Sequence, residues 1–476
     1  MKLTERICFW GSVTLGVMAA CVGLLAMCEP AHAQGADDAQ LAKRGQYLAL
    51  AGDCVACHTA PHGKPFAGGL VLATPLGNII STNITPSRTQ GIGNYTFEQF
   101  ADAVRKGIRA DGAHLYPAMP YTSYAQISDD DMKALYAYFM HDVAPVDEAT
   151  PKTDLPFPFN IRLSMAFWNM LFLDPKPFEA DPSKSAEWNR GAYLVRGLAH
   201  CSTCHSPRNA LMAEDVSREL AGGAVGTWYA PNITPDVNSG VGAWSEADLV
   251  SYMRAGHATG KAQAAGPMAE AVDNSLRHLS DADLKAMAVY LKSIPAVHES
   301  TGTRPADAWG TPRNVLDDVR GVAWPADSSQ LTGAQLYDGY CASCHQAKGE
   351  GTRDGGLPSL FHNTALGHTN TDNLVMVMLD GVEHKADAPD ILMPGFAGLL
   401  TDQQIATLGN FLLTQFGNPD AKITVKQVQT LRAGGEQSSL VGLARAGMIV
   451  ALLVIIAVIV LLVRRSRRHA RPAQQG

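Results

Sequence analysis

The chain has little charge and no spare cysteine. Charged residues make up 17% of its 476 residues, and the formal net charge is −7. The body of the chain contains no basic stretch of the kind that binds nucleic acid, so nucleic-acid partners are not expected. Three of the nine cysteines lie in the first 33 residues, and the other six belong to three pentapeptides. No cysteine is left over for a structural disulfide.

The three pentapeptides are Cys-x-x-Cys-His motifs at residues 54–58, 201–205 and 341–345. This motif is typical of covalent haem c attachment, in which two thiols add to the porphyrin and the adjacent histidine binds the iron. A redox dithiol does not need the histidine, and a structural zinc ion needs four ligands gathered close together. Three copies therefore predict three haem c groups, attached through Cys54, Cys57, Cys201, Cys204, Cys341 and Cys344, with His58, His205 and His345 on the iron atoms.

Each iron needs a sixth ligand, and thioether ligation raises the reduction potential of a c-type haem. A methionine precedes the last expected helix of each haem region, in a stretch that contains proline or glycine and is expected to form a loop. The predicted distal ligands are Met119, Met268 and Met393. The open alternatives are Met253 or His257 in place of Met268, and bis-histidine ligation through His114 or His278.

Length and internal repetition predict three consecutive helical domains in a mainly α fold. With a haem motif and a later methionine in each, these domains resemble class I cytochromes c. The repetition is clearest where Arg190-Gly191-Ala192-Tyr193 matches Arg44-Gly45-Gln46-Tyr47, and where an Asn-Ile-Thr-Pro stretch occurs at residues 83–86 and 232–235. The expected boundaries are 36–146, 185–297 and 330–418 for the domains, 147–184 and 298–329 for the linkers, and 419–445 for a C-terminal tether.

Hydrophobic periodicity and capping residues predict several helices. Helices are expected at 41–52, 97–106 and 373–379, and closing helices are expected after Ser128, Ser280 and Thr401. The apolar run at 165–173 in the first linker predicts packing between domains, with a partner-subunit or membrane-surface contact as the alternative. Apolar positions in the tether, at Ile423, Val425, Val428 and Leu431, predict that it packs along the body.

Both ends of the chain carry membrane signals. Residues 1–33 combine Lys2 and Arg6, an apolar run and an Ala31-His32-Ala33 cleavage pattern, which predicts an export signal peptide. Lipidation at Cys28 is the alternative. Residues 446–463 contain no charge and would span ~27 Å as a helix, close to the thickness of a bilayer core. An arginine cluster at 464–471 indicates a cytoplasmic tail (464–476), so the soluble body is expected in the periplasm, anchored in the inner membrane.

At the level of whole motifs, the sequence resembles the three-haem cytochrome c subunit of membrane-bound periplasmic dehydrogenases. The likeness covers about 40–416 and is carried by the stretches at 53–60, 81–86, 91–95, 116–121 and 135–140. The resemblance implies that electrons arrive from a catalytic dehydrogenase subunit and leave to ubiquinone. It implies a partner of the quinoprotein alcohol, flavin or molybdenum aldehyde type, with alcohol or aldehyde oxidation as the expected reaction.

Two features depart from the alcohol dehydrogenase members of that family. These are the C-terminal apolar helix with its arginine cluster and the stretch at 156–162, and both favour the molybdenum aldehyde type. Two other classes of function are open: a multihaem enzyme such as a peroxidase, and a subunit of a terminal oxidase. An enzyme needs an open iron position with acid–base groups above it, whereas each region here offers its own methionine. Substrate oxidation is therefore expected in a partner subunit.

Overall fold

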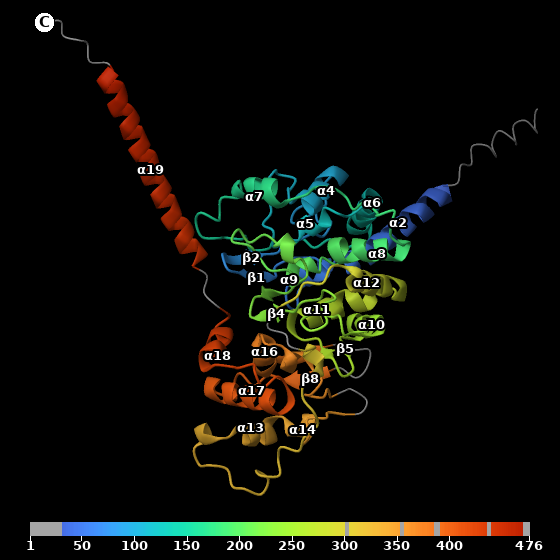
Figure 1. Cartoon of the computed structure of the whole chain (residues 1–476). Helices are drawn as coiled ribbons and strands as arrows, with labels where there is room; N and C mark the ends of the chain where they lie inside the picture. The colour runs from blue at the N-terminus through green and yellow to red at the C-terminus, as the bar shows by residue number, and fades with distance from the viewer. Residues whose placement is uncertain (1–30, 300–303, 353–356, 385–390, 436–438, 470–476) are drawn as a thin grey trace, which may run out of the picture.

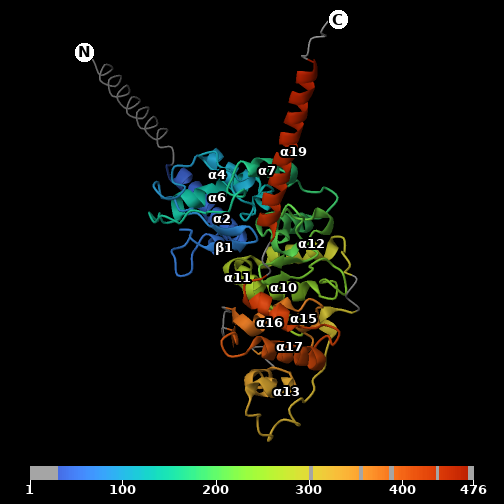
Figure 2. The ribbon, with the colours of Figure 1, turned by 90° about the vertical axis from the view of Figure 1, so that its left-hand side faces the viewer.

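The computed structural model describes residues 31–299, 304–352, 357–384, 391–435 and 439–469 (Figure 1). Most of the predicted signal peptide, including Cys28, lies outside these residues. The described chain is mostly helical, and its strands form four two-stranded antiparallel sheets. Figures 1 and 2 show the three regions stacked along one body, from which a long C-terminal helix projects. The predicted mainly α fold class is confirmed.

In the first region, local signals define the helix boundaries. Thr96 and Gln99 form a capping box before α4, which ends at Gly107 with φ of 63°. Ser128 accepts a hydrogen bond from the backbone N–H of Asp131 and so begins α6, as predicted. The elements are α2 (Ala31–Ala51), α3 (Cys54–Cys57), β1 (Val71–Thr74), β2 (Gly77–Ile80), α4 (Phe97–Lys106), α5 (Tyr121–Tyr124), α6 (Asp129–Ala137) and the π-helix η1 (Tyr138–Asp142). Helix α2 begins ten residues before the expected position 41.

The second region repeats this order. Ser280 caps α12 as Ser128 caps α6, and a capping box of Ser245 and Asp248 precedes α10. The elements are α8 (Ala186–Tyr193), η2 (Leu194–Leu198), α9 (Ser202–His205), η3 (Val216–Arg218), β3 (Gly223–Val225), β4 (Trp228–Ala230), α10 (Glu246–Ala255), β5 (His257–Ala258), β6 (Ala262–Gln263), α11 (Gly266–Asn274), η4 (Leu276–His278) and α12 (Asp281–Ser293).

The third region has a simpler order, and Thr401 caps its closing helix as predicted. Its elements, with the preceding linker, are η5 (Ala306–Ala308), η6 (Ser328–Gln330), α13 (Gly333–Tyr340), α14 (Ala342–His345), α15 (Thr364–Gly367), α16 (Asp372–Asp380), β7 (Gly381–His384), β8 (Ile391–Pro394) and α17 (Asp402–Phe416). The tether packs as predicted: α18 (Val425–Arg432) lies on this region, and Ile423, Val428 and Leu431 are buried.

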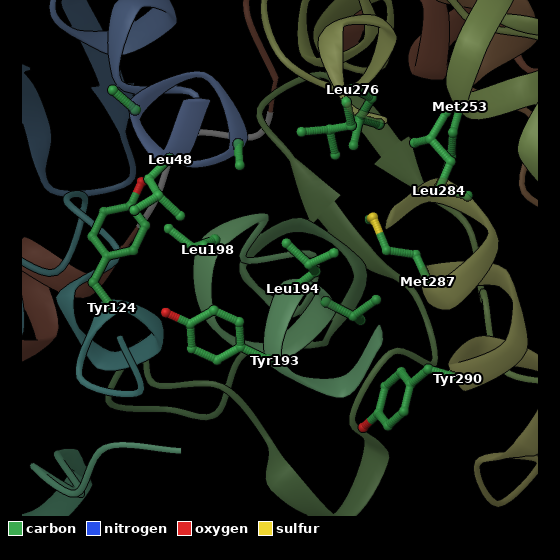
Figure 3. Close-up of a cluster of buried hydrophobic side chains, with 14 of the residues drawn as sticks. Leu48, Tyr124, Tyr193, Leu194, Leu198, Met253, Leu276, Leu284, Met287 and Tyr290 are labelled. Atoms are coloured by element: carbon green, nitrogen blue, oxygen red, sulfur yellow. The ribbon is translucent and has the colours of Figure 1, made fainter. Parts of the chain in front are cut away.

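The first two regions share one hydrophobic core, whereas the third has its own. Leu48 of α2 and Tyr124 of α5 lie beside Tyr193, Leu194 and Leu198 of the second region (Figure 3). The third region and the linker before it join the second region through Trp228, which packs against the core of the third, and through polar contacts. Asn373 exchanges two hydrogen bonds with the backbone of Tyr229, and Lys261 forms an ion pair with Asp307.

A reciprocal pair of side-chain contacts holds the first two regions together. The Tyr193 hydroxyl donates to Asp131 at 2.6 Å and accepts from the Ser128 N–H at 3.3 Å. In the opposite direction, the Tyr47 hydroxyl donates to Asp283 at 2.6 Å and accepts from the Ser280 N–H at 3.1 Å. Each aspartate is also paired with an arginine of its own region, as the pairs Arg44–Asp131 and Arg190–Asp283 show. We call these contacts the Tyr–Asp pairs. The duplicated Arg-Gly-x-Tyr motif thus forms the joint between the two copies.

Helix α7 (Ser164–Phe172) lies in the first linker, and none of its residues is buried. The expected interdomain packing of the apolar run at 165–173 is therefore wrong for the outward side of this helix, where Phe167, Met170 and Leu171 are exposed. The long C-terminal helix is α19 (Leu440–His469). Within its segment Leu440–Ser466, an 18-residue window has a mean hydropathy of 3.4 and is not buried against the body, so the helix is long and apolar enough to cross a membrane.

Candidate haem-binding sites

Each Cys-x-x-Cys-His motif forms a short helical turn that follows a longer helix, in α3, α9 and α14. Residues three apart on such a turn lie on one side, so each turn presents its two cysteines together. None of the six motif cysteines is joined to another by a disulfide. Burial raises the pKa of Cys54, Cys201 and Cys341 to about 12. A redox dithiol depends on a readily formed thiolate, which a raised pKa disfavours.

The three motif histidines share one hydrogen-bonding arrangement, in which Nδ1 faces a backbone carbonyl oxygen. The contacts are His58 to Thr82 at 2.7 Å, His205 to Pro231 at 2.6 Å and His345 to Pro358 at 2.9 Å. A carbonyl oxygen only accepts, so Nδ1 carries the proton and Nε2 keeps its lone pair. Burial lowers the pKa of each ring, which keeps it neutral, although the carbonyl partly offsets this effect. Each histidine therefore fits an iron ligand.

A zinc site does not fit the same residues. In the part of the chain that the structure describes, no three His, Cys, Asp or Glu side chains gather as a metal-binding group. Structural zinc needs four such ligands. The donor set at each motif, two thiols and one neutral imidazole, instead fits covalent haem c.

The three predicted distal methionines are partly buried and pack against the core of their regions. Met119 lies in an irregular turn just before α5, as expected. Two expectations of a loop are wrong. Met268 lies in the first turn of α11, because Pro267 occupies the start of that helix, where its fixed φ is favourable. Met393 lies on strand β8, opposite Val382 of β7.

The alternative distal ligands differ in the contacts that their side chains already make. Met253 is buried on α10 and lies near Leu284 and Met287, in a position typical of core packing (Figure 3). The Nε2 atom of His278 contacts the Asp273 carbonyl at 2.9 Å, which engages one of its two ring nitrogens.

Two further histidines, His257 and His114, also stay open as alternatives. The Nδ1 atom of His257 faces the Ala255 carbonyl, so its Nε2 is available. His114 has a buried Nδ1 without a hydrogen-bond partner. The geometry favours Met268 over Met253, and leaves His257 as a competing ligand in the second region.

Sequence comparison agrees with this geometry. The family model described as "Cytochrome c" matches residues 42–141, 189–295 and 331–416, one match for each motif. The chain belongs to the cytochrome c family.

Relatives with assigned names are similar over most of this cytochrome. It is 47% identical to the fructose dehydrogenase cytochrome subunit of Gluconobacter japonicus, over 90% of this chain and 92% of that one. It is 43% identical to the gluconate 2-dehydrogenase cytochrome c subunit of Pantoea cypripedii, over 87% and 94%. A quinone alcohol dehydrogenase cytochrome c subunit of Gluconobacter oxydans is 40% identical, over 89% of each chain. The resemblance to cytochrome c subunits of dehydrogenases is thereby confirmed.

The cytochrome brings its first two motifs close together. Helix α11 of the second region packs on α3 of the first. Burial raises the pKa of Cys57 to about 11, and the charges of Asp53, Cys204 and Glu270 add to the effect. Because Cys204 belongs to the second motif, the two motifs lie within electrostatic range of each other.

Sequence reasoning missed two acidic residues between these motifs. Asp53 precedes Cys54 in a left-handed conformation, with φ of 50°. Burial, and then the charge of Glu270, raises the pKa of Asp53 to about 8. A charged residue directly before the motif was visible in the sequence as a signal, but its burial and its neighbour from α11 were not.

Proposed function

We propose that this cytochrome is the electron-transfer subunit of a membrane-bound dehydrogenase complex, carrying electrons from a catalytic subunit to ubiquinone. The observation that carries the proposal is the threefold recurrence of a half-buried motif histidine with Nδ1 on a carbonyl and Nε2 free. A haem c bound at such a site supplies one-electron transfer. Three such sites in one chain form a relay, and their closeness in the first two regions favours transfer between them.

In this proposal each residue has one role. The thiols of Cys54, Cys57, Cys201, Cys204, Cys341 and Cys344 attach three haem c groups. His58, His205 and His345 are proximal iron ligands, and Met119, Met268 and Met393 are distal ligands. The carbonyls behind the histidines orient the rings and hold the proton at Nδ1. The surrounding apolar side chains exclude water.

Carbon monoxide binding tests this assignment. We expect three six-coordinate low-spin haems in the reduced protein, with little carbon monoxide binding. Met393→Ala opens one sixth position and is expected to give one carbon monoxide adduct. For the second haem, Met268→Ala is compared with His257→Ala, and only the variant that lacks the true ligand should bind the gas. Rapid binding at all three haems of the unmodified protein would contradict the electron-transfer role and favour a peroxidase-like enzyme.

For the catalytic partner, we propose a dehydrogenase of a sugar or a sugar acid. Identity is 47% and 43% with the named subunits of fructose and gluconate dehydrogenases, against 40% with those of alcohol dehydrogenases. A subunit of a nicotinate dehydrogenase from Pseudomonas putida is also 40% identical, but this cytochrome covers only 34% of its length. Alcohol and aldehyde oxidation, including a molybdenum partner, remain the alternative.

Gentle detergent extraction tests the partner. A larger dehydrogenase subunit is expected to co-purify, and its substrate is then found by reducing the haems with fructose, gluconate, ethanol or acetaldehyde in turn. Reduction by one substrate should be followed by reduction of a soluble ubiquinone analogue. Isolation of a lone cytochrome that reduces no quinone would contradict the proposal.

We further propose that α19 anchors the body on the periplasmic side of the inner membrane. The arginines near the end of α19, together with the predicted export signal, support this orientation. Protease added to spheroplasts should digest the haem regions, while a tag after residue 476 should be reached only in inverted vesicles. The opposite accessibility would contradict the orientation.

A further inference from the structure

A group of exposed apolar side chains gathers on one segment of the first linker. Phe157, Leu163, Phe167, Met170 and Leu171 have exposed fractions of 51%, 66%, 64%, 75% and 63%. We call these five residues the α7 patch. Ile161, with an exposed fraction of 47%, lies in the same segment; outside α19, the other large exposed apolar side chains of the described residues are spread over the three regions and the second linker. Single exposed apolar residues are ordinary, but a concentrated group marks a contact with an apolar partner.

The patch follows helical geometry. Residues 163, 167, 170 and 171 are spaced i, i+4, i+7 and i+8, which places them in one stripe along the outward side of α7. The segment from 156 to 173 contains Arg162 and no acidic residue. An apolar stripe without carboxylates suits a surface that holds lipid acyl chains and anionic headgroups.

The inward side of α7 is fixed to the body by hydrogen bonds. Asn169 accepts from the Tyr121 hydroxyl at 2.7 Å and donates to the Lys106 carbonyl at 3.0 Å. The Trp168 indole N–H donates to the Leu211 carbonyl at 2.9 Å. Because these contacts set the rotation of the helix, the fold itself determines that the opposite stripe is exposed.

The membrane-spanning candidate lies next to this patch. Arg445, in the second turn of α19, donates from Nε to the Phe157 carbonyl at 3.0 Å. Both views show α7 beside the first part of α19, on the side of the body from which α19 leaves (Figures 1 and 2). The uncharged run of α19 begins one residue after Arg445. A bilayer surrounding that run therefore reaches the segment that carries the patch.

We infer that the α7 patch rests in the interfacial layer of the membrane beside α19, so that two contacts hold the cytochrome on the bilayer. This inference rests on the proposed anchoring by α19. A single helix allows the body to swing, whereas a second contact fixes which face of the first two regions meets the lipid. The membrane is favoured over a protein partner because the patch is continuous with α19 and carries no acidic residue.

Photolabelling from the bilayer tests the inference. The full-length holoprotein is placed in vesicles of phosphatidylglycerol and phosphatidylcholine that contain a diazirine-bearing phospholipid, irradiated, digested and analysed by mass spectrometry. We expect labelled peptides from α19 and from 157–171. The exposed Val322 and Trp324 of the second linker serve as the internal control and should stay unlabelled.

The possible outcomes distinguish the membrane contact of the α7 patch from the anchor formed by α19. Labelling of α19 without labelling of 157–171 overturns the inference and leaves the anchor intact. Absence of label on both removes the anchor itself. Equal labelling of the control peptide also overturns the inference, because the label is then unspecific.

A substitution supplies the second measurement. Phe167→Gln combined with Met170→Gln changes only exposed side chains, and Val322→Gln is the matched control. The double variant should reduce labelling at 157–171 to the control level while α19 stays labelled. The measurement is repeated with the co-purified dehydrogenase bound. Loss of label at the patch in that complex would assign the surface to the protein partner and overturn the membrane contact.

Discussion

Removing the Tyr193 hydroxyl should loosen the joint between the first two haem regions. This hydroxyl donates to Asp131 at 2.6 Å, and both residues are buried, with exposed fractions of 7% and 4%. A hydrogen bond to a charged group contributes about 1.5–3 kcal/mol. Tyr193→Phe also leaves the Ser128 N–H without its hydroxyl acceptor. We therefore expect a loss of about 2 kcal/mol in the free energy of opening this joint.

Native-state hydrogen exchange of the detergent-solubilised holoprotein is the appropriate assay, because unfolding of a chain with several domains is not two-state. A loss of about 2 kcal/mol corresponds to roughly 30-fold faster exchange at amides protected by the joint. This faster exchange is expected in peptides around Ser128 and at the start of α6. Peptides of α17, in the separate core of the third region, should not change.

Tyr136→Phe is the matched control. Its hydroxyl donates to the Tyr95 carbonyl at 2.9 Å, within the first region and to a neutral acceptor. Its expected effect is about 1 kcal/mol, confined to the first region. The reasoning is refuted if Tyr193→Phe changes exchange no more than Tyr136→Phe, or if it affects the third region equally.

Three further predictions concern packing, pH and anchoring. Gly45→Ala should prevent stable haem incorporation, because its Cβ would lie 1.9 Å from the Ala134 carbonyl oxygen, whereas Gly398→Ala, with open space around it, should leave the haem spectrum unchanged. Burial raises the pKa of Asp283, but hydrogen bonds from its arginine and tyrosine partners outweigh this and lower the pKa overall. The Asp283 carboxylate therefore stabilises the fold fully above its unfolded pKa of about 4, and this stabilisation is lost as the pH falls through its pKa in the folded state. Over that pH range, the urea concentration at the midpoint of the haem absorbance change should fall in the unmodified protein and should fall less in Asp283→Asn. Removal of everything after Gly434 should release a soluble three-haem protein in which ubiquinone reduction falls far more than dye reduction. Equal loss of both activities would contradict the anchoring role.

Much of the chemistry was readable from the sequence because it depends on neighbouring residues. The three motifs place two thiols and a histidine within five residues. The caps at Ser128, Ser280 and Thr401 act on backbone N–H groups three residues later, so the starts of the closing helices were predicted correctly. The apolar run of α19 was also recognisable from consecutive residues alone. The resemblance to dehydrogenase cytochrome subunits was also carried by short motifs.

Features formed by contacts between residues far apart in the sequence became visible only in the tertiary structure. Tyr47 and Asp283 are 236 positions apart, and nothing in either motif indicates that the two copies contact each other reciprocally. The stripe on α7 was visible as helical spacing, but helical spacing does not distinguish a buried face from an exposed one. The hydrogen bonds of Trp168 and Asn169 with three other segments fix the rotation of α7, and this rotation turns the apolar side outward. The physical reason is that burial is a property of the assembled body, whereas a cap or a motif is complete within one turn of chain.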